Sequence, residues 1–205
     1  MPTVVLATRN TGKIKELSSL LEAFGITVQG LDAHPEIGDI PETGETFEEN
    51  SRIKAEAVSL ATGLTALADD SGLAVDFLDG APGVYSARYS EEPGNPATPA
   101  RNNEKLLAAL AGVPWEQRRA RFRCVVVAAA PNGAELTADA SWEGYVAEEL
   151  RGGGGFGYDP LFFDPELGKH AAELDRRDKN ARSHRGKALK ELLAHWPEFW
   201  ARARA

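Results

Sequence analysis

The sequence predicts an α/β protein with a mixed β-sheet. Segments with apolar residues at helical spacing alternate with short apolar strands, which is typical of this class. In addition, two long strand segments, 119–131 and 135–150, are joined by the turn Pro-Asn-Gly, so a hairpin is expected there. No repeat or linker interrupts the 205 residues. We therefore expect one domain, 1–205, with room for two lobes.

The first part of the chain predicts a strand, a helix and a second strand. TVVLAT (3–8) has the composition of a short buried strand, and the loop RNTGK follows it. The second strand, ITVQGL, spans 26–31. Between the two strands, apolar side chains recur at helical spacing at Ile14, Leu17, Leu20, Leu21 and Phe24.

The middle of the chain begins with a loop, 32–45, that is rich in proline, glycine and acidic residues. Thr46, with Glu49 three residues later, forms a capping-box pattern, so a helix is expected from there to about Ala61. Gly63 is the expected stop. Beyond it we expect two strands, a loop and a helix at 64–70, 73–78, 81–99 and 100–113.

The last part of the chain combines a glycine-rich segment with a helix. RGGGGFGYDPLFF (151–163) is rich in glycine and then apolar. SHRGKALKELLAHWPEFWARA predicts one helix from about Ser183 to His195, and a short second helix is an option after it.

The composition excludes several classes of partner. The formal net charge is −8 and no long basic block is present, so a nucleic-acid polymer is not expected, although a small anionic ligand is compatible. The longest apolar run, 124–130, is far shorter than a membrane span, and MPTVVLATRN shows neither a basic leader nor a signal-length apolar region. The single cysteine, Cys124, excludes an internal disulfide. We therefore expect a cytoplasmic protein without a membrane partner.

Two carboxylates, Asp69 and Asp70, follow the apolar strand. Because side chains alternate along a strand, we expect only one of the two to face a ligand site. Mg²⁺ takes one or two carboxylates together with waters and substrate phosphates, and Glu42 in the loop IPETGE is a candidate for the second ligand. A solvated turn at Asp-Asp-Ser-Gly is the alternative. Other acidic residues compete with Glu42, namely Glu45, Glu48 and Glu49.

The loop Thr8–Lys13 lies where a strand gives way to a helix. Backbone N–H groups at a helix N-terminus, a glycine and a lysine suit a phosphate group. The loop lacks the spacing of the Walker P-loop, and an ordinary turn with a capping threonine or asparagine would give the same pattern. Both interpretations stay open at this point.

Two further segments have the composition of a nucleotide site. Four glycines, 152–155, precede Phe156 and Asp159, which suits a flat heterocycle that stacks on the ring while backbone N–H groups and the carboxylate bind its edge. A glycine bulge beside core aromatics is the alternative. At the head of the last helix, a place that favours anions, the chain gathers Lys179, Ser183, His184 and Arg185.

Together, these motifs resemble one family. They are TRNTGK, FEENSRIKAEA, LADDSGLAVDFLDGAPGVYSARYS, GGFGYDPLFF and SHRGKAL. In this order they are similar to the inosine triphosphate pyrophosphatase family, in its bacterial dITP/XTP form, over roughly residues 3–193. The resemblance weakens in 90–99, at the hairpin tip and in the tail HWPEFWARARA.

The resemblance implies an elongated central mixed sheet flanked by helices, with two lobes around a substrate cleft, and a homodimer. It implies Mg²⁺-dependent hydrolysis of ITP, dITP and XTP to the nucleoside monophosphate and pyrophosphate, which cleanses the nucleotide pool. Asp70 would be the general base and, with Glu42, a metal ligand. The implied substrate-binding residues are Thr8, Arg9, Asn10, Thr11, Gly12, Lys13, Ser71, Phe156, Gly157, Tyr158, Asp159, Lys179, His184 and Arg185.

Two other functions remain open. One is a pyrophosphatase of the Maf-like fold that acts on other modified nucleotides, against which FGYD and SHR argue. The other is a nucleotide sensor without catalysis. A protein that only binds gains little from carboxylates beside phosphates, so Asp69, Asp70 and Glu42 favour an enzyme.

Overall fold

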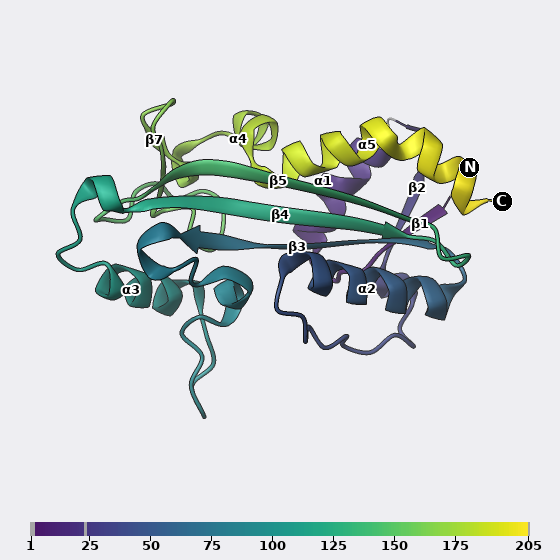
Figure 1. The fold of residues 1–205 in the computed structure, drawn as a ribbon, viewed down its shortest axis with the longest axis horizontal. Coiled ribbons are helices and arrows are strands. Elements are labelled where there is room, and N and C mark those ends of the chain that lie inside the picture. Colours follow the sequence, from purple (N-terminus) through teal and green to yellow (C-terminus); the bar gives the residue numbers. More distant parts are fainter. Residues whose placement is uncertain (1–2, 23, 205) are drawn as a thin grey trace. The chain divides into compact units, whose positions relative to one another are not determined.

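The computed structural model describes residues 3–22 and 24–204 (Figure 1). Its strands are β1 (Thr3–Leu6), β2 (Thr27–Gly30), β3 (Thr65–Val75), β4 (Arg119–Ala129), β5 (Glu135–Val146), β6 (Phe162–Asp164) and β7 (Lys169–His170). Its α-helices are α1 (Thr11–Glu22), α2 (Phe47–Thr62), α3 (Pro99–Ala109), α4 (Arg176–Arg182) and α5 (His184–Ala203).

The strands form one mixed sheet in the order β2-β1-β3-β4-β5-β6-β7. β1 is parallel to both of its neighbours, with Val4 opposite Val28 of β2 and Thr65 of β3. β6 is antiparallel to both β5 and β7. β4 and β5 are adjacent, and in the turn between them Ala130 N donates to Ala134 O at 2.9 Å. The predicted mixed sheet is therefore confirmed.

The chain forms two compact units. The first contains the residues up to Asp70, Val125–Asp139 and the chain from Ala188, and the second contains Ser71–Cys124 and Ala140–Lys187. The boundaries fall within β3, β4, β5 and α5, so each unit takes part of these elements.

The core of the first unit lies between the parallel strands and their helices. Val5 of β1 and Ala66 of β3 pack with Val58 of α2. Of the apolar residues predicted for the first helix, Leu17 and Leu21 are buried in α1. Phe24 follows the helix and is 53% exposed, and Leu20 lies outside the residues whose side chains the structure describes.

α2 begins and ends where the sequence predicts. Thr46 Oγ1 accepts a hydrogen bond from Glu49 N at 3.1 Å, and Glu49 Oε2 accepts from Thr46 N at 3.2 Å. This capping box satisfies two of the N–H groups at the start of the helix. Gly63 follows the last turn at φ +65°, a conformation that favours glycine.

The core of the second unit is rich in aromatic side chains. The ring centroids of Phe122 in β4 and Phe162 in β6 are 4.6 Å apart. Trp142 of β5 meets Phe162 edge-on at 5.0 Å. Leu73 of β3 and Leu106 of α3 are fully buried in the same cluster. These contacts between aromatic rings join β4, β5 and β6.

β3 corrects the prediction of two separate strands. The expected break at Asp-Asp-Ser-Gly is absent, because β3 runs without interruption from Thr65 to Val75. Leu73 and Val75 are fully buried, so the strand continues into the core beyond the polar residues. The alternative of a solvated turn is therefore wrong. Instead of a strand, 76–78 form a short 3₁₀ helix.

α5 is longer than predicted. It runs from His184 to Ala203 and contains Pro197, whereas the sequence suggested an end near His195. A proline inside a helix costs about 3 kcal/mol. Leu192, Trp196 and Phe199 are buried on either side of this position, and their burial offsets that cost.

Two expectations from composition concern Cys124 and the membrane. Cys124 is fully buried in β4, as expected for a cysteine in an apolar strand. Among residues 3–22 and 24–204, no helix is both long and apolar enough to cross a membrane.

Asp164, at the end of β6, is a buried carboxylate with four donors. Its Oδ2 accepts from Trp142 Nε1 at 2.9 Å and from Arg182 Nε at 3.2 Å. Its Oδ1 accepts from the backbone N–H groups of Glu166 and Leu167 at 2.8 and 3.1 Å. Burial alone would raise the pKa of Asp164, but these donors and the charge of Arg182 hold it below its ordinary value.

We predict that Asp164→Asn lowers the free energy of unfolding by about 1–3 kcal/mol at neutral pH, because it removes a charged acceptor from these donors. A carboxyl with a lowered pKa in the folded state stabilises the protein above its unfolded pKa, about 3.9, and loses that contribution as the pH falls through the folded pKa. In urea unfolding, the difference between wild type and variant should therefore shrink as the pH falls below the unfolded pKa of about 3.9. A difference that stays constant over that range would contradict this account.

Candidate functional site

In the first unit, the predicted carboxylates of Glu42 and Asp70 converge on the ammonium group of Lys54. Lys54 Nζ lies 2.6 Å from Glu42 Oε1 and 3.8 Å from Asp70 Oδ1. It also donates to the backbone oxygen of Asp69 at 2.9 Å. The side chain of Lys54 is only 12% exposed. One cation from α2 therefore holds two carboxylates that come from a loop and from β3.

Sequence reasoning misses Lys54 and Asn50, which lie four positions apart on α2. Asn50 Nδ2 donates to Asp70 Oδ2 at 3.2 Å. Residues at this spacing share one face of a helix, and here the face is the buried one that also carries Phe47 and Val58. The sequence did contain a signal for both residues, because each places a polar side chain on the apolar face of a predicted helix.

The Asp70 carboxylate is mostly buried, with 13% of its side chain exposed. Burial raises the pKa of Asp70 above its ordinary value, and the nearby charge of Glu42 raises it further. Lys54, Asn50 and Lys13 lower the pKa without cancelling the rise. A raised pKa suits a carboxylate that accepts a proton from water during a reaction.

Asp69, the other member of the acidic pair, reaches α1. Lys13 Nζ donates to its Oδ1 and Oδ2 at 2.9 and 2.8 Å, and the side chain of Asp69 is 3% exposed. Asp69 thus contacts α1 while Asp70 contacts α2, as expected for neighbours in a strand.

The residues from Thr8 to Asn10 form the turn that starts α1. Asn10 N donates to Thr8 Oγ1 at 3.1 Å, and Lys13 N donates to Asn10 Oδ1 at 3.2 Å. Asn10 therefore caps α1, and the capping turn that the sequence left open is present. Thr11, the first residue of α1, is exposed. Gly12 belongs to α1 but lies outside the residues whose surroundings the structure describes.

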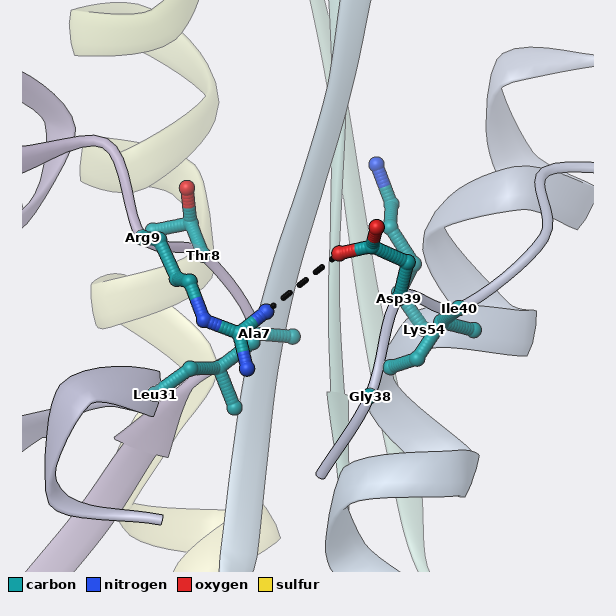
Figure 2. Close-up of a pocket in the computed structure, with 8 residues that line it drawn as sticks. All are labelled: Ala7, Thr8, Arg9, Leu31, Gly38, Asp39, Ile40 and Lys54. Carbon is teal, nitrogen blue, oxygen red and sulfur yellow. Dashed lines mark hydrogen bonds and ion pairs between the residues drawn. The ribbon is translucent and has the colours of Figure 1, made fainter. Parts of the chain in front are cut away.

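A cavity of about 300 Å³ lies beside this turn (Figure 2). Arg9 reaches toward the opposite wall, where its Nη1 is 3.5 Å from Asp39 Oδ1 and its Nη2 donates to the backbone oxygen of Ile37. The cavity is lined by Ala7, Thr8, Arg9, Leu31, Gly38, Asp39, Ile40 and Lys54.

In the second unit, two cations lie close to one exposed aromatic ring. Lys179 Nζ is 4.8 Å and Arg185 Cζ is 5.6 Å from the centroid of the Phe156 ring. Phe156 is 62% exposed. Cations near the face of an aromatic ring are attracted by it. An exposed aromatic ring can stack on a flat base, and the cations beside the ring can donate hydrogen bonds to the edge of that base.

Asp159 holds this arrangement together. Its Oδ2 accepts from Phe156 N at 2.6 Å and from Lys179 Nζ at 2.5 Å. The side chain of Asp159 is 4% exposed. In the free protein, the Asp159 carboxylate therefore positions Phe156 and Lys179.

His184 and Arg185 begin α5, and both are buried. The ring of His184 stacks on Phe122 with centroids 4.9 Å apart and an angle of 14°. Arg185 Nη2 donates to Ser71 Oγ at 3.2 Å. The start of α5 thus contacts both β4 and the second half of β3.

Gly157 and Tyr158 are held by residues earlier in the chain. Asn103 Nδ2 of α3 donates to Gly157 O at 3.0 Å. The Tyr158 hydroxyl donates to Ser86 O at 2.9 Å, and burial raises the pKa of this phenol. The Tyr158 side chain belongs to the core, so its backbone is the part that remains for a ligand.

The structure thus gathers most of the predicted residues in two clusters, one in each unit, with Thr11 and Gly12 in neither. No three histidine, cysteine, aspartate or glutamate side chains form a metal-binding group within the part of the chain that the structure describes. In the first unit the cluster contains Thr8, Arg9, Asn10, Lys13, Glu42 and Asp70. In the second unit it contains Ser71, Phe156, Gly157, Tyr158, Asp159, Lys179, His184 and Arg185.

Residues 4–195 match the Ham1 family. The chain belongs to this family. A dITP/XTP pyrophosphatase from Nitratidesulfovibrio vulgaris is 58% identical over 202 residues, which cover 97% of each chain. A dITP/XTP pyrophosphatase from Streptococcus pyogenes is 49% identical over 201 residues, and this chain spans 60% of that longer relative.

Solved structures of Ham1 proteins share the fold. The HAM1 protein from Coxiella burnetii has a TM-score of 0.89 and 44% identity, covering 97% of this chain and 100% of its own. The Ham1 protein from Staphylococcus aureus has a TM-score of 0.87 and 38% identity, covering 96% and 98%. The family resemblance and the α/β fold expected from the motifs are therefore confirmed.

The activity named for the curated Ham1 relatives generally implies a divalent metal. The donor set of the first unit fits such an ion, because Glu42 and Asp70 already converge on one positive charge, that of Lys54. Mg²⁺ takes one or two carboxylates and completes its shell with waters and phosphates. Glu42 and Asp70 are the residues that would hold it.

Gly155 is required by the geometry around Asp159. Its φ is +76°, and a Cβ atom there would lie 2.1 Å from Asp159 Oδ2. Gly153, in the same glycine run, has nothing within 4 Å of the position of a Cβ atom. The two glycines therefore differ in what a methyl group would meet.

We predict that Gly155→Ala lowers the free energy of unfolding by about 1–3 kcal/mol, since it strains the backbone and displaces the Asp159 carboxylate from Phe156 N and Lys179. Gly153→Ala is the matched control and should change stability by less than about 1 kcal/mol. Denaturant unfolding of both variants measures the difference. Equal effects would show that the contact with Asp159 does not constrain this loop.

Proposed function

We propose that this Ham1 protein hydrolyses the non-canonical purine nucleoside triphosphates ITP, dITP and XTP to the monophosphate and pyrophosphate, with Mg²⁺. The observation that carries the proposal is the convergence of Glu42 and Asp70 on Lys54, in a chain that is 58% identical to a dITP/XTP pyrophosphatase. Carboxylates and lysines in one place suit a reaction in which phosphate charge must be neutralised while water attacks.

Asp70 acts as the general base in this proposal. Its carboxylate accepts a proton from the attacking water, and its raised pKa makes it a better proton acceptor than an ordinary aspartate. Asn50 donates to Oδ2 and so fixes the orientation of the carboxylate. The chemistry that Mg²⁺ supplies when it is bound is neutralisation of charge on the phosphate oxygens.

Lysine side chains supply further positive charge around the phosphates. Lys13 is held by Asp69, and Lys54 is held by Glu42 and Asp70, so neither ammonium group has to be ordered when substrate arrives. The N–H groups at the start of α1 and the Thr8 hydroxyl complete the phosphate side of the proposed site.

We assign the second cluster to the base. Hypoxanthine and xanthine carry a carbonyl group at C6, where adenine carries an amino group. Lys179 and Arg185 can only donate hydrogen bonds, so they suit the carbonyl and leave a donor facing a donor with ATP. A mismatch of this kind can discriminate by roughly 10⁴. Phe156, which is largely exposed, would stack on the ring system.

The biological role proposed is removal of damaged purine nucleotides before polymerases use them. Residues 1–205 act as one catalytic domain in this proposal, as the family resemblance implies. A homodimer in the cytoplasm is part of the same proposal and is supported by the family resemblance.

Release of pyrophosphate from ITP, XTP, dITP, ATP and GTP, each with Mg²⁺ and with EDTA, tests the proposal directly. We expect fast release from the first three with Mg²⁺, none with EDTA, and little from ATP. GTP shares the C6 carbonyl, so its release measures whether the 2-amino group of guanine is also rejected. Binding of ITP without release of pyrophosphate from any of the nucleotides would instead indicate a sensor.

We predict that Asp70→Asn lowers kcat for ITP by about 10²–10⁴, because the amide cannot take the proton from water. Binding of ITP should persist, since the other cationic groups remain. Asp76→Asn serves as the control, because that carboxylate is 44% exposed and pairs with Arg121. An Asp70→Asn protein that folds normally and turns over like the control would rule out the role of Asp70.

A further inference from the structure

Arg9 connects the loop Thr8–Lys13 to a distant segment of the first unit. Its Nη1 is 3.5 Å from the Oδ1 of Asp39, which lies 30 positions away, and its Nη2 donates to the backbone oxygen of Ile37. Figure 2 shows the side chain extended toward Asp39, with Lys54 near the same wall of the cavity. Arg9 therefore fastens together two segments that both line this cavity.

The lining of the cavity suits an anion. Thr8 contributes a hydroxyl group, and Arg9 and Lys54 contribute positive charge. Asp39 is the only acidic residue among the 8 that line it. Because Lys54 also contacts Glu42 and Asp70, the cavity adjoins these two carboxylates.

The ion pair between Arg9 and Asp39 is easy to exchange. The side chain of Asp39 is fully exposed, and that of Arg9 is 42% exposed. Pairs of this kind contribute about 0–1 kcal/mol. A polyphosphate carries several negative charges, and a guanidinium group binds its oxygens in a bidentate way. Arg9 therefore gains by leaving Asp39 for a phosphate.

We propose that Arg9 is a latch for the pyrophosphate end of the substrate. In the free protein it bridges two walls of the cavity through Asp39 and Ile37, and with substrate it moves to the β- and γ-phosphates. The inference rests on the proposed function, because the bond that breaks there joins the α- and β-phosphates and Asp70 acts at the α-phosphate. The leaving pyrophosphate then needs cations of its own, and Arg9 and Lys54 are those that the cavity offers.

Inorganic pyrophosphate is the probe for this latch, and calorimetric titration with Mg²⁺ at fixed salt measures its affinity. Asp39→Asn should tighten binding about two- to fivefold, because the competing carboxylate is removed. Arg9→Gln should weaken binding about tenfold, because a charged donor is lost. In the double variant, Asp39→Asn should no longer tighten binding, since the two residues act through one contact.

The ion pair of Arg101 with Glu92 in the second unit supplies a matched control. Its atoms are 3.4 Å apart, and its side chains are 27% and 67% exposed. Arg101→Gln and Glu92→Gln remove one charge each, as the test variants do. Both should leave the affinity for pyrophosphate unchanged.

The outcomes separate the latch from the proposed function. If wild type releases pyrophosphate from ITP but Arg9→Gln binds pyrophosphate as tightly as wild type does, the latch is wrong and the proposed function stands. If Asp39→Asn still tightens binding in the Arg9→Gln background, Asp39 acts by its charge alone and the latch is again wrong. A wild-type protein that neither hydrolyses ITP nor binds pyrophosphate would overturn both.

Discussion

Pairing of buried carboxylates with lysines is the interaction on which the rest of this structure depends. A carboxylate that is removed from water costs several kcal/mol unless a cation and hydrogen bonds compensate it. In the first unit Asp69 is paired with Lys13, and in the second unit Asp159 is paired with Lys179. Each pair joins a strand or loop to a helix. The same charges therefore fix the positions of the helices and concentrate lysines where the family motifs lie.

This arrangement explains how a protein with a net charge of −8 can offer sites for polyanions. Acidic residues such as Glu48 and Glu49 are exposed, whereas Lys13, Lys54 and Lys179 are each held by an aspartate that is mostly buried. Lys54 illustrates the principle, because two carboxylates and a backbone oxygen fix its ammonium group before any ligand is present. An anion that arrives there meets oriented charge and does not have to order a flexible side chain.

Local signals in the sequence predicted local structure well. The capping box of Thr46 and Glu49 acts within four residues, and the hairpin between β4 and β5 depends on one turn, so both could be predicted. The continuity of β3 and the passage of α5 through Pro197 depend on burial against distant residues, which overrides local preference. Lys54 of α2 was not predicted as a site residue because its partners lie in other elements of the fold, Glu42 in a loop and Asp70 in β3. The motifs in the sequence identified the segments that form the two clusters. Only the fold shows which carboxylate pairs with which lysine.

The burial of Cys124 has a chemical consequence. The sequence contains one cysteine and one methionine, and Cys124 is the only sulfur-containing residue among those that the structure describes. Its side chain is fully enclosed in β4, and oxidants attack thiols that they can reach as thiolates. The chemical stress that damages bases in the nucleotide pool also oxidises sulfur. Among residues 3–22 and 24–204, the structure therefore offers no exposed sulfur atom to such an oxidant.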